Sequence, residues 1–74
     1  MRYTIKALRL DLEKYNASLA KYGHTYSLKA EARNGYTGLD LYEGDKCLRN
    51  LECGTPRECL NGARDFIIDA QWSY

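Results

Sequence analysis

The fold is decided by residues 30–40, AEARNGYTGLD. Asn34-Gly35 is the dipeptide that a type I′ turn favours, because both central residues of that turn need a positive φ. A two-residue loop at this point pairs Arg33 with Tyr36 in an antiparallel hairpin. Counting outward along the hairpin then predicts the pairs Lys29–Asp40 and Ser27–Tyr42 on one face, and Ala30–Leu39 and Leu28–Leu41 on the other. Opposite charges meet on the first face and apolar side chains meet on the second, so both patterns favour one register.

The strand before the turn alternates over its whole length. We expect one face of it to be buried, with Tyr26, Leu28, Ala30 and Ala32, and the other exposed, with Ser27, Lys29, Glu31 and Arg33. After Tyr42, residues 43–46 form a second turn, and a third strand runs from about Cys47 to Cys53.

The register of the third strand is ambiguous. A two-residue Gly44-Asp45 loop pairs Leu41 with Leu48 and Asp40 with Arg49. Strict alternation then places Asn50 and Glu52 in the core, where Leu51 and Cys53 are better suited. We therefore expect a bulge near Arg49-Asn50, which reverses the alternation. A longer turn that places Cys47 and Leu51 inward is the competing interpretation.

A helix is expected on each side of the strands. The first runs from about Thr4, its N-cap, to Lys21, and Gly23 ends it. Its apolar residues recur at spacings of three and four: Ile5, Leu8, Leu12, Tyr15, Leu19 and Tyr22. The second runs from Pro56 to about Gln71, with Thr55 and Glu58 as a capping box.

The second helix buries a stripe of Cys59, Leu60, Ala63, Phe66, Ile67 and Ala70. Gly62 on this helix allows a close approach to the first helix or to the sheet, and Trp72 and Tyr74 are expected to cover the core. The fold class is α+β, in the order α-β-β-β-α. Both helices pack on one face of a three-stranded antiparallel sheet, and the other face is left bare.

The length and the net charge restrict the classes of function that the chain can have. Seventy-four residues make a single domain, residues 1–74, and 11 basic and 10 acidic residues give a net charge of +1. This balance disfavours a strongly nucleic-acid-binding domain, which has a basic excess. No apolar stretch reaches the roughly 20 residues of a membrane span, and the N-terminus lacks the apolar region of a signal peptide. We expect a protein of the cytoplasm.

Catalytic and metal sites have little support in the sequence. Cys47, Cys53 and Cys59 are spaced by six residues, and the single histidine, His24, lies far from them. This pattern matches no zinc motif, and the odd count favours reduced thiols at core or boundary positions. We expect no enzyme, no metal and no cofactor.

Two surfaces are candidates for partner binding. The bare sheet face is expected to expose Lys29, Glu31, Arg33, Tyr36, Asp40, Tyr42 and Arg49. Tyrosine and arginine are enriched in binding hot spots, so Tyr36, Tyr42 and Arg49, with Arg33, are the first choice. Arg2, Lys6 and Arg9 at the start of the first helix are the second choice, because cations there oppose the helix dipole and suit an anionic partner.

The α-β-β-β-α order resembles the double-stranded-RNA-binding domain, which implies phosphate contacts from lysines at the start of the last helix. The matching stretch here, residues 55–61, TPRECLN, has one basic residue and no lysine.

The chain also resembles small accessory proteins of bacteriophages and mobile elements. The residues that carry this are KAL (6–8), LEKYN (12–16), LDLY (39–42) and LECGTPRE (51–58). That resemblance implies an inhibitor of host defence, such as an anti-CRISPR protein, in the cytoplasm of a bacterial host.

We therefore expect a non-catalytic binding module that binds a host protein or a protein–nucleic-acid complex stoichiometrically, with no cofactor and no membrane. Direct nucleic-acid binding is the alternative. A homodimer is a third hypothesis.

Overall fold

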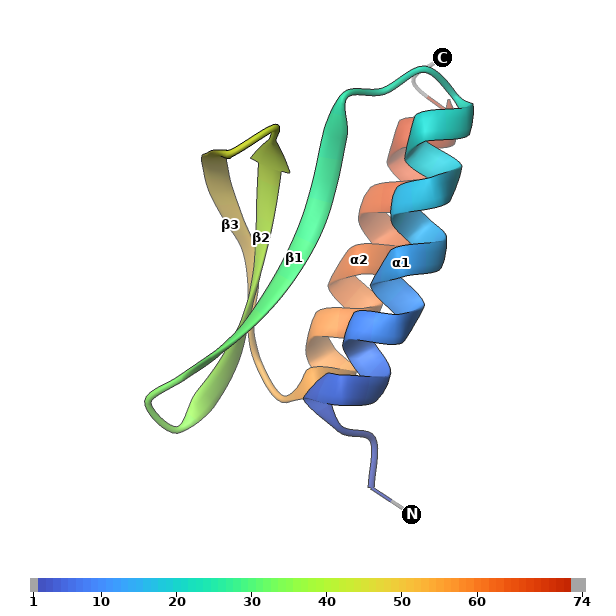
Figure 1. Cartoon of the computed structure of the whole chain (residues 1–74). Coiled ribbons are helices and arrows are strands. Elements are labelled where there is room, and N and C mark those ends of the chain that lie inside the picture. The colour runs from blue at the N-terminus through green and yellow to red at the C-terminus, as the bar shows by residue number, and fades with distance from the viewer. Residues whose placement is uncertain (1, 73–74) are drawn as a thin grey trace.

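The computed structural model describes the backbone of residues 2–72 and the side chains of residues 2–69. The element order is α1 (Ile5–Lys21), β1 (Tyr26–Arg33), β2 (Tyr36–Glu43), β3 (Lys46–Gly54) and α2 (Pro56–Trp72). The sheet is antiparallel in the order β1-β2-β3, and both helices lie side by side on one of its faces (Figure 1). The predicted α-β-β-β-α fold is confirmed.

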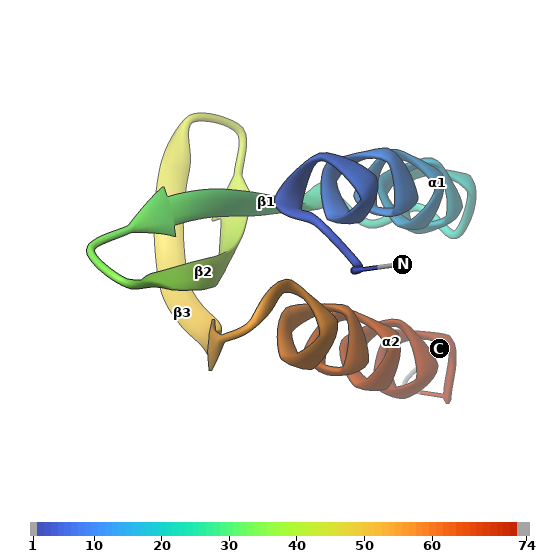
Figure 2. The ribbon, with the colours of Figure 1, turned by 90° about the horizontal axis from the view of Figure 1, so that it is seen from below.

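Because three antiparallel strands separate the helices, α1 and α2 run in the same direction. Both begin at the end of the molecule where β1 turns into β2, as Figures 1 and 2 show. The segment that leads into α1 lies between the two helix starts (Figure 2). This arrangement brings residues from the beginning and the last third of the chain together.

The ends of α1 follow from local chemistry. Thr4 is the N-cap, and its hydroxyl accepts a hydrogen bond from the Ala7 N–H at 3.2 Å. At the other end Gly23, with φ 84°, adopts the left-handed conformation that closes a Schellman motif. In that motif the His24 N–H donates to the Leu19 carbonyl at 2.9 Å. Both predicted boundaries of the helix are confirmed.

The start of α2 is a reciprocal capping box. The Glu58 N–H donates to the Thr55 hydroxyl at 3.2 Å, and the Thr55 N–H donates to the Glu58 carboxylate at 3.1 Å. Two backbone donors that the helix cannot satisfy itself are thereby bonded.

We expect Thr55→Ala to lower the free energy of unfolding by about 0.5–2 kcal/mol, because the cap is lost. Denaturant unfolding followed by circular dichroism measures this. Thr55→Ser keeps the hydroxyl and serves as the control. An unfolding midpoint that does not move in the alanine variant contradicts a capping role for Thr55.

The core lies between the sheet and the two helices. It consists of Leu8, Leu12, Leu19, Leu28, Leu39, Leu41, Cys59, Leu60, Ala63 and Ile67. Phe66 is partly buried against it, so the predicted stripe of α2 is confirmed as far as Ile67. The side chains of Ala70 and Trp72, and all of Tyr74, lie outside the described residues. Three expectations are wrong, since Tyr22, Tyr26 and Ala32 are exposed.

The β1–β2 hairpin has the predicted register at every position, including Arg33–Tyr36, Lys29–Asp40 and Leu28–Leu41. The side of β1 away from β2 is bonded to α1. Asn16 donates to the Leu28 carbonyl at 3.1 Å and accepts the Leu28 N–H at 2.7 Å. One side chain of α1 therefore takes the place of a neighbouring strand.

The third strand departs from the prediction. Gly44-Asp45 is a two-residue loop, since Glu43 pairs with Lys46, so the longer turn is wrong. The ladder then skips Leu48 and Leu51, which gives two irregularities on either side of the expected bulge at Arg49-Asn50. Leu41 consequently pairs with Arg49, and not with Leu48. Asp40 pairs with Asn50, and not with Arg49.

The second irregularity, at Leu51, breaks the strict alternation that would have turned Leu51 away from the core. It lets Leu51 pack against the core, whereas Cys53, which we expected to point inward, is exposed. Glu52 pairs with Leu39 and lies beneath α2 at Gly62, where an added Cβ would come within 3.0 Å of the Glu52 Cβ. Gly62 therefore allows α2 to approach the sheet closely.

Candidate partner-binding surface

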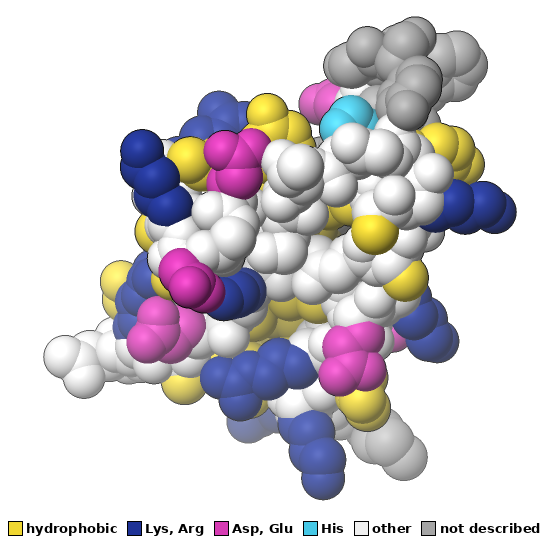
Figure 3. Space-filling model, turned by 45° about the horizontal axis from the view of Figure 1, so that its top comes forward, with side chains coloured by type: hydrophobic (Ala, Val, Ile, Leu, Met, Phe, Trp, Pro, Cys, Tyr) yellow, Lys and Arg dark blue, Asp and Glu magenta, His cyan; other side chains and the backbone are white. Residues whose placement is uncertain are grey.

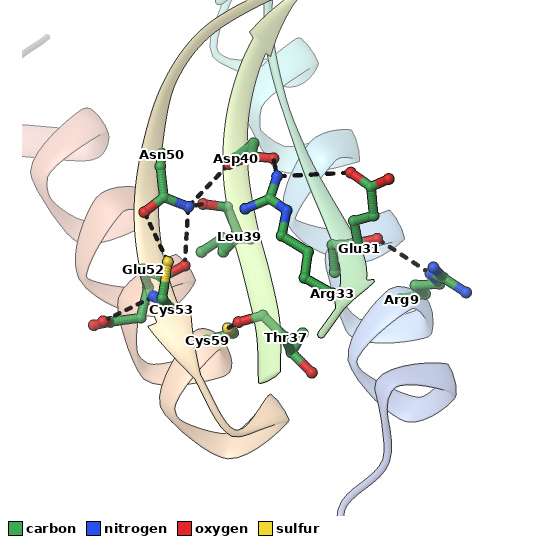
Figure 4. Close-up of polar contacts among 11 residues, drawn as sticks. Arg9, Glu31, Arg33, Thr37, Leu39, Asp40, Asn50, Glu52, Cys53 and Cys59 are labelled. Carbon is green, nitrogen blue, oxygen red and sulfur yellow. Dashed lines mark hydrogen bonds and ion pairs between the residues drawn. The ribbon is translucent and has the colours of Figure 1, made fainter. Parts of the chain in front are cut away.

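A polar cluster occupies the centre of the open sheet face (Figure 4). Asp40 on β2 is only 3% exposed. Its carboxylate accepts hydrogen bonds from the Arg33 guanidinium and from the Asn50 amide, the latter at 2.9 Å. Arg33 also lies 3.6 Å from the Glu31 carboxylate. The hydrogen bond to Asp40 raises the pKa of Arg33 above its usual value.

Gly38 makes this cluster possible. A Cβ at this position would overlap the Arg33 guanidinium, because the arginine side chain crosses β2 over the glycine to reach Asp40. The sequence suggested that Asp40 is exposed beside Lys29, and that expectation is wrong. Lys29 is its cross-strand neighbour, but the Lys29 ammonium lies over the Tyr42 ring, 4.4 Å from the ring centre.

The three residues chosen first for partner binding do not form one cluster. Arg49 pairs with Leu41, a core residue, and therefore belongs to the helix side of the sheet. Tyr36 and Tyr42 lie six residues apart on β2, which separates them by roughly 20 Å at the rise of a strand. Tyr36 lies beside the β1–β2 turn, and Tyr42 lies at the far end of the strand.

The three cations at the start of α1 also separate. Arg2 precedes the helix and Lys6 is exposed in its first turn. Arg9 turns toward the sheet, and its Nε–H donates to the Ala30 carbonyl at 3.3 Å. It lines a groove of about 280 Å³ between α1 and β1, whose floor includes Leu12 and Leu28. Figure 3 looks into this groove, where a hydrophobic floor lies between basic and acidic side chains.

Two hollows adjoin at the end of the molecule where both helices begin. One, of about 560 Å³, is lined by Arg2, Tyr3, Thr55, Pro56 and Arg57. The other, of about 470 Å³, is lined by Arg33, Gly35, Tyr36, Thr37, Gly54, Thr55, Pro56 and Glu58. Thr55 and Pro56 belong to both. We call the residues that converge here the helix-start surface: Arg2, Tyr3, Arg33, Tyr36, Thr55, Pro56 and Arg57.

The helix-start surface unites part of each predicted site. Tyr36 and Arg33 come from the sheet, and Arg2 comes from the segment before α1. Tyr3 and Arg57 were not among the residues predicted from the sequence. The number of strands could have indicated these residues. With an odd number of antiparallel strands between them, two helices on one face of a sheet begin at the same end of the molecule.

The three thiols differ in their surroundings. Cys47 and Cys53 are exposed and free, and the Cys53 thiol donates to Asn50 at 3.1 Å. Cys59 is fully buried beneath the sheet, where its thiol donates to the Thr37 carbonyl at 3.4 Å. Burial raises the pKa of the Cys59 thiol from 9.0 to about 11.

We expect a thiol reagent at neutral pH to modify Cys47 and Cys53 in the folded protein and Cys59 only after unfolding. Mass spectrometry of the labelled peptides measures this. Because the neutral Cys59 thiol is favoured in the fold, its contribution to stability is complete below pH 9.0 and is lost as the pH rises toward 11. Equal labelling rates at all three positions would contradict the packing of α2 on the sheet.

The described residues contain no group of three or more His, Cys, Asp or Glu side chains that could hold a metal ion. Within the same part of the chain, neither helix has the length and apolarity needed to cross a membrane. Comparisons with protein families, with curated proteins and with solved structures found no match.

Proposed function

We propose that the protein is a non-catalytic binding module of phage or mobile-element type, which inhibits a host defence complex by covering part of its surface. The observation that carries this proposal is the convergence of Tyr36, Arg33 and Arg2 on the helix-start surface, beside two adjoining hollows. Tyrosine and arginine are the side chains that dominate binding energies at protein interfaces, and hollows accept a partner's side chains.

The polar cluster behind this surface supports the same proposal. Arg33 is fixed by Asp40, and Asp40 is in turn bonded to Asn50 on the next strand. These bonds join β2 to both of its neighbouring strands. Tyr36, which is 43% exposed, therefore projects from a strand that is fixed in position. A surface that is ordered before binding loses less conformational entropy in the complex.

Direct nucleic-acid binding is the second candidate. The specific observation in its favour is that Arg2 and Arg57 line one hollow, with Lys6 in the first turn of the adjoining helix. The balance of 11 basic and 10 acidic residues favours the protein partner.

Affinity capture from a bacterial lysate, with and without nuclease, tests the proposal. The wild-type protein is expected to retain a partner in stoichiometric amount after nuclease treatment, and Tyr36→Ala is expected to lose it. Tyr26→Ala is the matched control, because Tyr26 is 38% exposed and lies at the opposite end of the hairpin. Capture that disappears with nuclease would support nucleic-acid binding, and equal capture by both variants would refute the assignment of Tyr36.

A further inference from the structure

Tyr3 forms a fixed wall of the larger hollow. It packs against the core, and its hydroxyl donates to the Asp11 carboxylate of α1 at 2.5 Å. Burial and this hydrogen bond raise the pKa of Tyr3 well above its usual range, so the hydroxyl remains a donor. The ring is thereby held in one orientation at the start of α1.

Arg57, in the first turn of α2, uses that ring as its support. Its guanidinium lies over the Tyr3 ring, 4.4 Å from the ring centre. A cation over an aromatic face is held in position without a neutralising counter-charge. Among the described residues, no carboxylate forms an ion pair with Arg57 or with Arg2, which lines the same hollow.

The acidic groups at this end of the molecule are already bonded to other partners. The Asp11 carboxylate accepts the Tyr3 hydroxyl, and the Glu58 carboxylate accepts the Thr55 N–H in the capping box. Two arginines therefore face a hollow that also has apolar walls, the Tyr3 ring and the Pro56 ring. Such a site is complementary to a ligand that combines negative charge with apolar surface.

We propose that the hollow formed by Arg2, Tyr3 and Arg57 binds the carboxylates of an acidic segment of the partner protein. The inference rests on the proposed function and names the chemistry of its partner. A guanidinium matches a carboxylate with two parallel hydrogen bonds, which gives both strength and direction. The net charge of +1 over the whole chain favours a short acidic segment over an extended polyanion.

Isothermal titration calorimetry with a short capped peptide of alternating Glu and Leu tests this inference at low and at physiological ionic strength. The same peptide with Gln in place of Glu is the uncharged control. We expect Arg57→Gln to weaken binding of the acidic peptide by roughly 10-fold or more, since a hydrogen bond to a charged group is lost. Tyr3→Leu is expected to weaken it as well, because the support of the guanidinium is removed.

Arg64→Gln is the matched control variant. Arg64 is also exposed on α2, on the same side of the helix but about two turns beyond Arg57, and it does not line the hollow. Circular dichroism of each variant checks that the fold is retained. Binding that is unaffected by Arg64→Gln, is weakened by Arg57→Gln and declines with salt supports the inference.

Equal binding of the Glu and Gln peptides, or equal loss in the Arg57 and Arg64 variants, would overturn the inference. Tighter binding of a short RNA duplex than of the acidic peptide at the same salt would also overturn it. Failure of the proposed function has a different signature, since nuclease-resistant capture from lysate would then not depend on Tyr36. If capture depends on Tyr36 but the acidic peptide does not bind, the proposed function stands and this inference alone is overturned.

Discussion

Replacing Leu39 with Ala is expected to lower the free energy of unfolding by about 2–5 kcal/mol. Leu39 lies on the central strand, is 0% exposed, and faces the core beneath both helices. Its removal leaves a cavity that the rigid sheet cannot close. A chain of 74 residues has a total stability of roughly 4–11 kcal/mol, so this single change removes a large share of it.

Urea unfolding of the Leu39→Ala variant, followed by circular dichroism, measures the loss. Leu48→Ala is the matched control, because Leu48 lies on the adjacent strand of the same sheet but is 40% exposed. Its effect is expected to stay within about 0.5 kcal/mol. Similar losses in both variants would mean that the β2–β3 register is not the one described.

Replacing Gly38 with Ala is expected to give the second large effect, about 1–3 kcal/mol, because it leaves the buried Asp40 carboxylate without its cation. The new Cβ would overlap the Arg33 guanidinium, which can turn away because it ends a flexible side chain. The cost then arises at Asp40, which is 3% exposed and, among the described residues, keeps the hydrogen bond from Asn50 alone.

A double-mutant cycle with Asp40→Asn isolates this effect. A neutral amide at position 40 does not require a cation, so Gly38→Ala in that background is expected to cost much less than it costs in the wild-type protein. Denaturant unfolding of the four proteins gives the coupling energy. Equal costs of Gly38→Ala in both backgrounds would show that the glycine does not serve the ion pair.

The first hairpin was predictable because three independent signals agree on its register. The Asn34-Gly35 turn, the apolar pair Leu28–Leu41 and the opposite charges of Lys29 and Asp40 all favour the same pairing. The third strand has no such agreement. Its irregularity at Leu51 lies next to Glu52, over which α2 packs at Gly62, and the pattern of the strand alone does not encode that contact with a helix.

The polar cluster was missed for a related reason. Cross-strand counting selects Lys29 as the partner of Asp40, because it considers residues directly opposite each other. The observed partner, Arg33, lies further along β1 and reaches Asp40 only because Gly38 has no side chain. A small residue between two opposite charges on neighbouring strands is therefore the sequence signal for a diagonal ion pair.

The helix-start surface was only half predictable. Arg2 and Tyr36 were identified as separate candidates, one on a helix and one on a sheet. The strand count places the two helix starts at one end of the molecule, whereas the stacking of Arg57 on Tyr3 depends on side-chain packing that no periodicity encodes.

The two hydrogen bonds between Asn16 and Leu28 affect how this protein can associate with other molecules. An open sheet is a template for polymerisation, because an unpaired edge strand can recruit a strand from another molecule. On β1 the Asn16 amide already occupies the backbone groups that an incoming strand would need at Leu28, and on β3 the two skips interrupt any continuous ladder. Association by strand addition is therefore disfavoured at both edges. Complexes of this protein are therefore expected to form through its faces and ends, and not by extension of the sheet.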